Sequence, residues 1–253
     1  MDGWCLGILN SEFFEIYTGY FENRPYRLPS VKPYRRYIQW LEKQDKQESA
    51  RYWENYLDSF DEQTGVPKTE ISMEGKGRYM EGTVSLELDL EKTAVLNRLA
   101  AGNHVTLNTI IQTLWGLLLG KYNGKEDVVF GAVVSGRPFA LEGVEYMVGL
   151  FINTIPVRIR FSDKMRFYQL LQQVQEEALA CEPYHYHPLA EIQSRSALKQ
   201  NLIDHILVFE NYPVTEQIED YAREKGKSDK ILIKLSKVEV FEQTNYDFNI
   251  SMA

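Results

Sequence analysis

The sequence predicts an α/β fold in which helices are layered on a sheet. The apolar run at 128–134 is continuous, which is typical of a central strand that is covered on both faces. Apolar residues recur at helical spacing on either side of that run, at 107–123 and 167–180. Strands and helices follow one another in mixed order through the second half of the chain, and this order indicates an α/β layered lobe.

The composition excludes several classes of protein. The chain has 253 residues, of which 44% are hydrophobic and 25% charged, so we expect one large globular domain or two small lobes. The formal net charge of −8 disfavours nucleic acid and anionic lipid as partners. No long apolar run and no basic leader is present, so we expect neither a membrane span nor a secretory signal. Two cysteines, Cys5 and Cys181, are too few for a disulfide framework and fit a cytoplasmic location.

The first third of the chain is expected to be helical with two linkers. Residues 4–20 carry apolar side chains at mostly helical spacing and predict an amphipathic helix. The three prolines of 23–33 predict an extended linker. Two more helices are expected around 34–43 and 52–57, where Tyr and Trp side chains share one face and pack in a core. The polar, glycine-containing stretch at 58–82 is interpreted as a crossing segment between lobes.

The elements after Gly82 build the predicted layers. Apolar and polar residues alternate at 84–90, which predicts a half-buried strand. A helix is expected at 91–101, followed by a nearly all-apolar helix that begins at the N-cap Thr106, ends at Gly124 and is buried on most sides. The remaining expected elements are strands at 128–134, 148–160, 204–213, 231–241 and about 245–252, and a helix that Asp163 caps and that runs to about Ala180.

The histidines carry no strong metal or catalytic pattern. His185 and His187 form an HxH pair, but no third ligand stands at a sensible spacing, so we do not expect a metal site. His205 lies in an apolar strand, which favours a buried, hydrogen-bonded histidine over a catalytic one. His104 precedes a helix cap and is expected to be solvated. The chain also lacks a Gly-rich phosphate loop, HExxH and GxSxG.

Polar residues stand at the ends of the predicted central strands. Ser135 and Arg137 follow the first of these strands, Asn153 interrupts the next, and Asn211 ends a third. Polar groups in or beside apolar runs must find partners. These polar residues either line a cleft or take part in turns and hydrogen-bond networks inside the protein. The sequence around them favours neither alternative.

These stretches resemble the condensation domain of non-ribosomal peptide synthetases. DVVFGAVVSGRP (127–138) and VGLFINTIPVR (148–158) carry the similarity, the second matching a Gly-x-Phe-Val-Asn-Thr motif with Ile152 in the Val position. Further similar stretches, in the order of the family, are YRRYIQWL (34–41), YWENYL (52–57), DHILVFENYP (204–213) and the Asn-Tyr-Asp-Phe run at 245–248. Two stretches depart from the family pattern, at 184–187 and 195–202, so the resemblance implies the family but neither the substrate preference nor the local detail of the site.

The start of the chain matches the end of the family signature His-His-x-x-x-Asp-Gly. Asp2 and Gly3 are its last residues, and Met1 occupies its third variable position. The second histidine, which is credited with catalysis in the family, would lie three positions before Met1, so we expect Met1 to be internal to a longer reading frame. By the resemblance, Asp2 and Gly3 are structural, and Asp2 is expected to pair with Arg137. The residues that we place in the substrate-binding part of the site are Trp4, Ser135, Asn153 and Asn211.

The resemblance implies a chloramphenicol-acetyltransferase-like fold of two lobes. Residues 1–57 would end the first lobe, 58–82 would cross over, and 83–253 would form the second lobe without its last elements. It implies amide formation between a donor acyl or peptidyl thioester and an acceptor aminoacyl group, both delivered on 4′-phosphopantetheine arms. The implied partners are upstream and downstream carrier domains, an adjacent adenylation domain and the missing first lobe. No metal and no directly bound cofactor is implied.

Three functions are therefore weighed. The first is part of a condensation domain, which we expect to be inactive as this chain alone because the histidine that orients or deprotonates the acceptor amine is absent from it. The second is an epimerisation domain of the same fold, which the DGWCLGIL start disfavours. The third is a non-catalytic module that binds a carrier domain or another partner, because a helix at 4–20 without its lobe would expose an apolar face.

Overall fold

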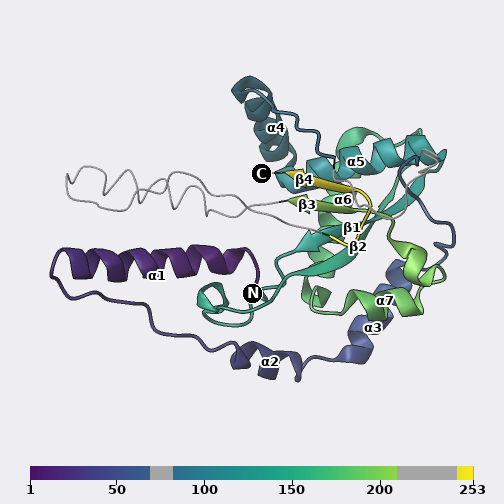
Figure 1. Ribbon diagram of the computed structural model, residues 1–253. Coiled ribbons are helices and arrows are strands. Elements are labelled where there is room, and N and C mark those ends of the chain that lie inside the picture. The colour runs from purple at the N-terminus through teal and green to yellow at the C-terminus, as the bar shows by residue number, and fades with distance from the viewer. Residues whose placement is uncertain (69–81, 210–243, 253) are drawn as a thin grey trace, which may run out of the picture.

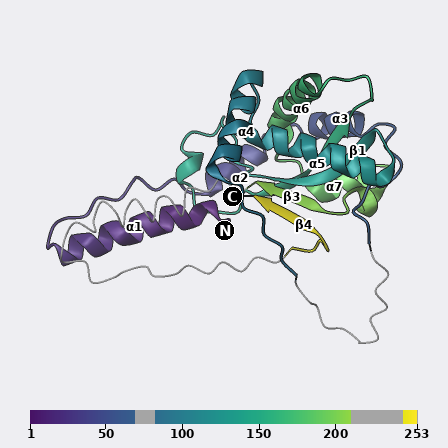
Figure 2. The ribbon, with the colours of Figure 1, turned by 90° about the horizontal axis from the view of Figure 1, so that it is seen from above.

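A computed structural model describes residues 1–68, 82–209 and 244–252. The expected strand at 231–241 and Asn211 lie outside the described residues. Those residues form a layered α/β body with a sheet at its centre and helices on both faces, so the predicted fold class is confirmed (Figure 1). Helix α1 (Trp4–Phe21) extends away from this body in both ribbon views (Figures 1 and 2).

The sheet of the described residues has four strands in the order β2-β1-β3-β4. Strand β1 (Asp127–Val134) is antiparallel to β2 (Asn153–Arg160), and it is parallel to β3 (Ile206–Phe209). Strand β4 (Asn249–Met252) adds in parallel to β3. Residues 128–132 of β1 are all buried, as the continuous apolar run predicts.

Helices cover both faces of the sheet because β1 sends alternate side chains to opposite sides. On one face, Val128 and Phe130 pack with Leu119 and Leu170 under α5 (Leu107–Asn123) and α6 (Phe167–Cys181), with α4 (Leu90–Asn103) outside them. On the other face, Val129 packs beneath α3 (Lys46–Tyr56) and α7 (Leu189–Arg195). A separate cluster joins α2 (Arg35–Leu41) to the loop before β2, where the 3₁₀ turn η1 (Val144–Tyr146) lies.

The capping predictions for α5 are confirmed. Thr106 is its N-cap, and the Thr106 hydroxyl accepts a hydrogen bond from the backbone N–H of Thr109 at 3.1 Å. Gly124 ends the helix with φ of +64°, the left-handed conformation that a C-terminal glycine adopts at low cost. The expected burial of α5 on most sides is confirmed, and Leu114 and Leu118 lie on the stripe of the helix that is exposed.

The predicted strand at 84–90 is wrong. Residues 82–89 have no regular structure, and Asp89 instead caps α4 through its carboxylate, which accepts from Lys92 N–H. The side chains of Val84 and Leu86 are 98% and 87% exposed. An alternating pattern indicates which face a strand would bury, but a strand also needs a neighbour for its backbone, and no described strand pairs here.

Two element boundaries also differ from prediction. The strand expected from 148 begins only at Asn153, because the backbone at Gly149 and Phe151 is hydrogen-bonded to the start of the chain instead of to β1. The helix expected after Asp163 begins at Phe167, with Arg166 as its N-cap and the Gln169 side chain accepting from Arg166 N–H at 3.0 Å.

The interpretations of His205 and His104 are confirmed. His205 is fully buried, and its Nε2 accepts from the indole N–H of Trp115 at 2.8 Å. His104 is exposed at the end of α4. His185 and His187 face different neighbours, and the described part of the chain holds no group of three or more potential metal ligands. No helix within the described ranges is long and apolar enough to cross a bilayer.

Candidate functional site

The predicted pair between Asp2 and Arg137 is present and buried. The Arg137 Nη2 atom lies 3.1 Å from Asp2 Oδ1, and the two side chains are 6% and 1% exposed. The other carboxylate oxygen of Asp2 accepts the backbone N–H of Phe151 at 3.0 Å. The thiol of Cys5, one helical turn on, donates to Asp2 Oδ1 at 3.1 Å. The carboxylate therefore has partners on both oxygens, as a buried charge requires.

Arg137 connects this carboxylate to the loop before β2. Its Nη1 atom donates to the carbonyl oxygens of Val144 and Met147, at 2.6 and 3.0 Å. The guanidinium carbon lies 4.0 Å from the centre of the Phe151 ring and 5.5 Å from that of Trp4. A single side chain at the end of β1 thus joins the start of α1, the turn after β1 and the loop 144–151.

Glycine permits the close approach of the backbone at this point. Gly136 has φ of +63°, and a Cβ there would lie 1.8 Å from the carbonyl oxygen of Phe151. The SGRP turn therefore needs glycine before Arg137. Gly149 is held by Cys5 and Asp2, since its N–H donates to the Cys5 sulfur at 3.3 Å and its carbonyl accepts the N–H of Asp2 at 3.2 Å.

The other predicted site residues are placed unequally. Trp4 belongs to the same cluster, and its indole N–H donates to the Glu145 carbonyl at 2.9 Å. Ser135 is exposed and its hydroxyl accepts from Arg137 N–H at 3.4 Å. Asn153 donates to the carbonyls of His185 and His187, so its amide orders the segment after α6. Contact of any of these residues with substrate stays a prediction, and Asn211 lies outside the described residues.

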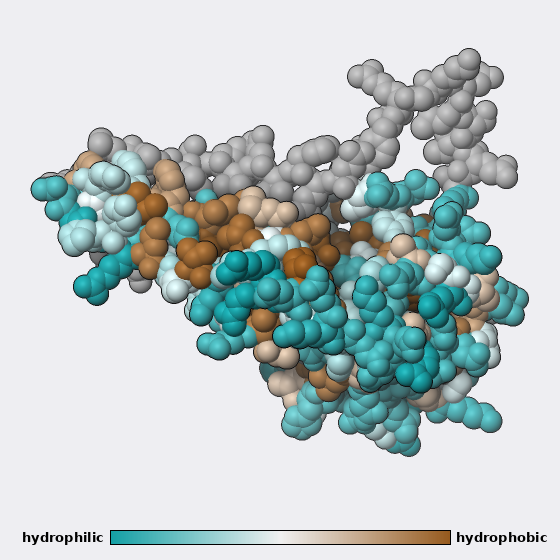
Figure 3. Space-filling view, turned by 90° about the horizontal axis from the view of Figure 1, so that it is seen from below, coloured by the Kyte–Doolittle hydropathy of each residue, from teal (hydrophilic) through white to brown (hydrophobic). Residues whose placement is uncertain are grey.

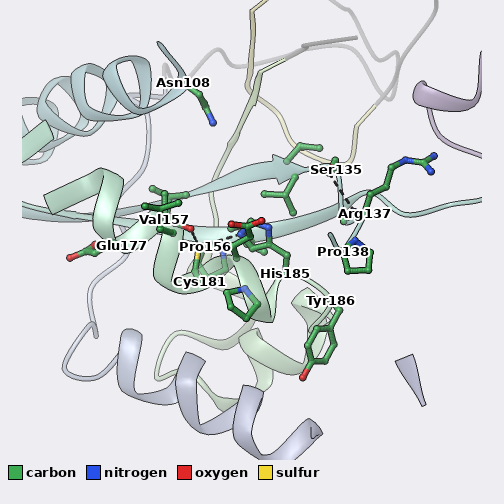
Figure 4. A pocket seen from close by; sticks show the side chains of 18 of the residues that line it. Asn108, Ser135, Arg137, Pro138, Pro156, Val157, Glu177, Cys181, His185 and Tyr186 are labelled. Atoms are coloured by element: carbon green, nitrogen blue, oxygen red, sulfur yellow. Dashed lines mark hydrogen bonds between the residues drawn. The ribbon is translucent and has the colours of Figure 1, made fainter. Parts of the chain in front are cut away.

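A cavity of about 790 Å³ opens beside the SGRP turn, at the carboxyl end of β1 (Figure 4). Residues 133–138 form one wall, the first turns of α5 form the second, and α6 with the 3₁₀ turn η2 (Glu182–Tyr184) forms the third. Strand β2 contributes residues 155–158. A cavity of this size and mixed polarity is typical of sites for small organic ligands.

A thiol and an imidazole meet in this cavity. The Cys181 sulfur lies 3.2 Å from His185 Nε2 (Figure 4). Burial raises the pKa of the Cys181 thiol to about 12 and lowers the pKa of His185 to about 4, so both groups are neutral at pH 7. The thiolate is the nucleophilic form of cysteine, so this pair is not an activated nucleophile.

Several residues of the site were missed by sequence reasoning. The contact of Cys5 with Asp2 was not predicted, because it depends on the turn that joins Asp2 to the start of α1. Asn108 and Gln112 stand four apart in an apolar helix, and this spacing was a usable signal for one polar face. The carbonyls of Val144 and Met147 carried no signal, because any residue supplies a backbone oxygen.

Helix α1 presents an exposed apolar face, as predicted. Phe13 is 52% exposed and Tyr20 is 76% exposed, and Leu6, Leu9 and Phe21 are also open to solvent. Seen from below, hydrophobic residues form a band along α1 that continues onto the body of the molecule (Figure 3). Such a band is larger than scattered surface apolar residues, and it is typical of an interaction surface.

Comparisons with known proteins agree with this geometry. The family model for the condensation domain matches residues 1–253. The chain is 48% identical to one of the plipastatin synthase subunits of Bacillus subtilis over 253 residues, and 42% identical to gramicidin S synthase 2 of Brevibacillus brevis over 250. It spans only 7% and 6% of the lengths of these two relatives.

The solved structures agree in fold. The first condensation domain of the CDA synthetase superposes with a TM-score of 0.68 at 17% identity, over 84% of this chain and 47% of that one. The same domain bound to a substrate analogue gives 0.67. The chain belongs to the condensation-domain family of non-ribosomal peptide synthetases, and its fold is the chloramphenicol-acetyltransferase-like fold of that family.

Proposed function

We propose that this chain works as one part of a peptide-bond-forming condensation domain. The observation that carries the proposal is the buried Asp2–Arg137 pair, which holds an Asp-Gly start of the family type against the end of β1 in a chain of that family. The share of the solved relatives that the chain covers, 47%, supports a complementary lobe that completes the domain. In this division, residues 1–57 belong to the first lobe, 58–82 cross over and 83–253 form the second lobe.

In the proposed reaction, the acceptor amine attacks the carbonyl carbon of the donor thioester. The new C–N bond forms, the C–S bond breaks, and the proton lost by the amine leaves with the thiol of the donor phosphopantetheine arm. Asp2 does not touch the reacting atoms in this scheme. Its role is positioning, since the carboxylate and Arg137 fix the strand end and the loop 144–151 around the start of α1.

The test supplies aminoacyl-loaded donor and acceptor carrier domains to two proteins. The first is the 253-residue chain, and the second is the longest protein of the source cell whose sequence includes this chain. We expect the peptide amide to form above the uncatalysed rate only with a protein whose mass is well above 29.5 kDa. If the native protein has that mass and still forms no amide bond, the proposal is wrong.

A non-catalytic carrier-binding module is the second candidate, and the exposed apolar face of α1 favours it. A native mass of 29.5 kDa, together with binding of a loaded carrier without product, would support it. Epimerisation is measured separately, as exchange of the α-proton of the aminoacyl group on a single loaded carrier with deuterated water. Of the three candidate functions, only epimerisation causes this exchange.

A further inference from the structure

The segment 184–187, which follows α6 and departs from the family pattern, is docked on helix α3. The Tyr184 hydroxyl donates to Glu48 Oε1 at 3.0 Å. The Tyr186 hydroxyl donates to the backbone carbonyl of Asp45, the N-cap of α3, at 3.2 Å. Two hydroxyls of one short segment therefore reach the same helix, and this docking gives the unusual sequence of the segment a structural reason.

The centre of this attachment is a buried contact between Ser49 of α3 and His187. The Ser49 Oγ atom lies 2.8 Å from His187 Nδ1, and the two residues are 0% and 1% exposed. Strand β2 holds the other side of the segment, because the Asn153 amide donates to the carbonyls of His185 and His187 at 2.8 and 2.7 Å. The imidazole of His187 is therefore enclosed between a hydroxyl and an anchored backbone, and β2 contributes an uncharged group.

The second ring nitrogen of His187, Nε2, is buried without a hydrogen-bond partner. The nearest carboxylate oxygen, Glu191 Oε2, lies 3.6 Å away, beyond hydrogen-bond distance, and the Glu191 side chain is 52% exposed, so water screens part of its charge. In an imidazolium both ring nitrogens carry hydrogens, so Ser49 could no longer donate to Nδ1 and the Nε2 hydrogen would lack an acceptor. A positive charge on this ring is therefore costly.

The surroundings of His187 also oppose a positive charge. Burial is the main reason that the pKa of His187 lies below its usual 6.5. Lys46 of α3 and Arg195 of α7 lower this pKa further, whereas Glu191 raises it. The other ionisable groups of α3 and of the segment have partners of their own or are neutral at pH 7: Asp45, Glu48, Glu54 and His185.

We propose that His187 is an acid-sensitive fastener between α3 and residues 184–187. The neutral imidazole holds the segment against the helix, and the segment detaches when the imidazole takes up a proton. The segment begins within η2, whose residues Glu182 and Pro183 form part of the cavity wall, so detachment also loosens that wall. This device goes beyond the proposed function and does not require it.

The test is hydrogen–deuterium exchange of a peptide that covers 182–188, measured by mass spectrometry from pH 7.5 to pH 5.5 and corrected for the intrinsic rate of exchange. A histidine that is neutral in the attached segment and has a pKa of 6.5 in the detached one raises the opening constant about tenfold over this range. If His187 and His185 are both released, the wild type should show a rise of up to about 100-fold. His187→Asn keeps a polar atom near the position of Nδ1 but does not titrate, so it should reduce this rise by about 5–10-fold.

His104→Asn is the matched control, because His104 is exposed and has φ of +57°, a conformation that asparagine adopts readily. Its pH dependence should equal that of the wild type. Ser49→Ala removes the hydroxyl but keeps the histidine, so it should raise the opening constant about fivefold at pH 7.5 and retain the rise toward acid pH. Far-ultraviolet circular dichroism checks that each variant is folded.

Equal rises in His187→Asn and the wild type overturn the proposal. If His187→Asn does not fold, the NMR signal of the His187 Hε1 proton in the wild type decides the question. A signal that titrates with a pKa of 6.5 or above overturns the fastener, because protonation would then be tolerated in place. A signal that stays neutral down to the pH at which the segment exchanges supports it.

Discussion

The Asp2–Arg137 pair allows a quantitative test by a double-mutant cycle. The variants are Asp2→Asn, Arg137→Met and the combination of the two. At 3.1 Å and an effective dielectric constant of about 20, the attraction between the charges is about 5 kcal/mol. Desolvation of both buried groups offsets part of this attraction, so the pair contributes less than that figure.

Each single change leaves one buried charge without its partner, which costs about 3–5 kcal/mol. Arg137→Met also removes the donors to the Val144 and Met147 carbonyls, so it should be the more damaging change. In the double variant no lone charge remains. We therefore expect it to lose about 4 kcal/mol, well below the sum of the single losses, with a coupling of about 2–6 kcal/mol.

The assay is urea-induced unfolding monitored by tryptophan fluorescence, because Trp4 lies against Arg137 and reports locally on the pair. The cycle on the exposed pair Asp89–Lys92 is the control, and its coupling should fall within experimental error. A coupling below about 0.5 kcal/mol for Asp2 and Arg137 would refute the reasoning, since the losses would then simply add.

Three further predictions concern stability. Burial lowers the pKa of His185 from 6.5 to about 4, so the folded state favours the neutral imidazole. The stability that the neutral imidazole contributes is therefore complete above pH 6.5 and is lost as the pH falls toward 4. In urea titrations over that range, the free energy of unfolding of the wild type should fall by about 3 kcal/mol more than that of His185→Gln. Tyr56→Phe should lower the free energy of unfolding by about 1–2 kcal/mol in the same assay. The Tyr56 hydroxyl accepts the backbone N–H of Arg158 at 2.7 Å, on the edge of β2 that no described strand pairs with. No loss of stability would mean that water replaces the hydroxyl as the acceptor. Gly136→Ala should destabilise the fold by more than about 2 kcal/mol in thermal melting, because Gly136 has a positive φ and its Cβ would meet the Phe151 carbonyl. Gly102→Ala, at a helical position with no neighbour near the new Cβ, should stabilise the fold by about 0.5–1 kcal/mol. Equal effects of the two substitutions would contradict this argument.

The elements that could be predicted are those that local sequence determines. The core strand β1 follows from an apolar run that no solvent-exposed strand could carry, and α5 follows from a Thr cap, helical spacing and a terminal Gly. The Asp2–Arg137 pair joins residues 135 positions apart in the sequence, and only the family resemblance indicated it.

The predictions that failed depend on what lies beside a segment. The pattern at 84–90 specifies a strand, but strand formation depends on a neighbouring strand, about which the segment itself carries no information. The early start predicted for β2 failed because Asp2 and Cys5 compete for the backbone of Gly149 and Phe151. The spacing of Asn108 and Gln112 indicates one polar face of α5, but their placement in one cavity with Gln175 of α6 depends on how the two helices pack.

The end of β1 ties the ion pair to the cavity, and this link leads to the last prediction. The SGRP turn carries Arg137 and also forms one wall of the cavity, so loss of the pair releases part of that wall. Asp2→Asn should therefore weaken both the fold and the binding of thiol-methylated pantetheine, measured below the unfolding transition. If Asp2→Asn binds the probe as tightly as the wild type, the cavity wall does not depend on the pair, and the two features act independently.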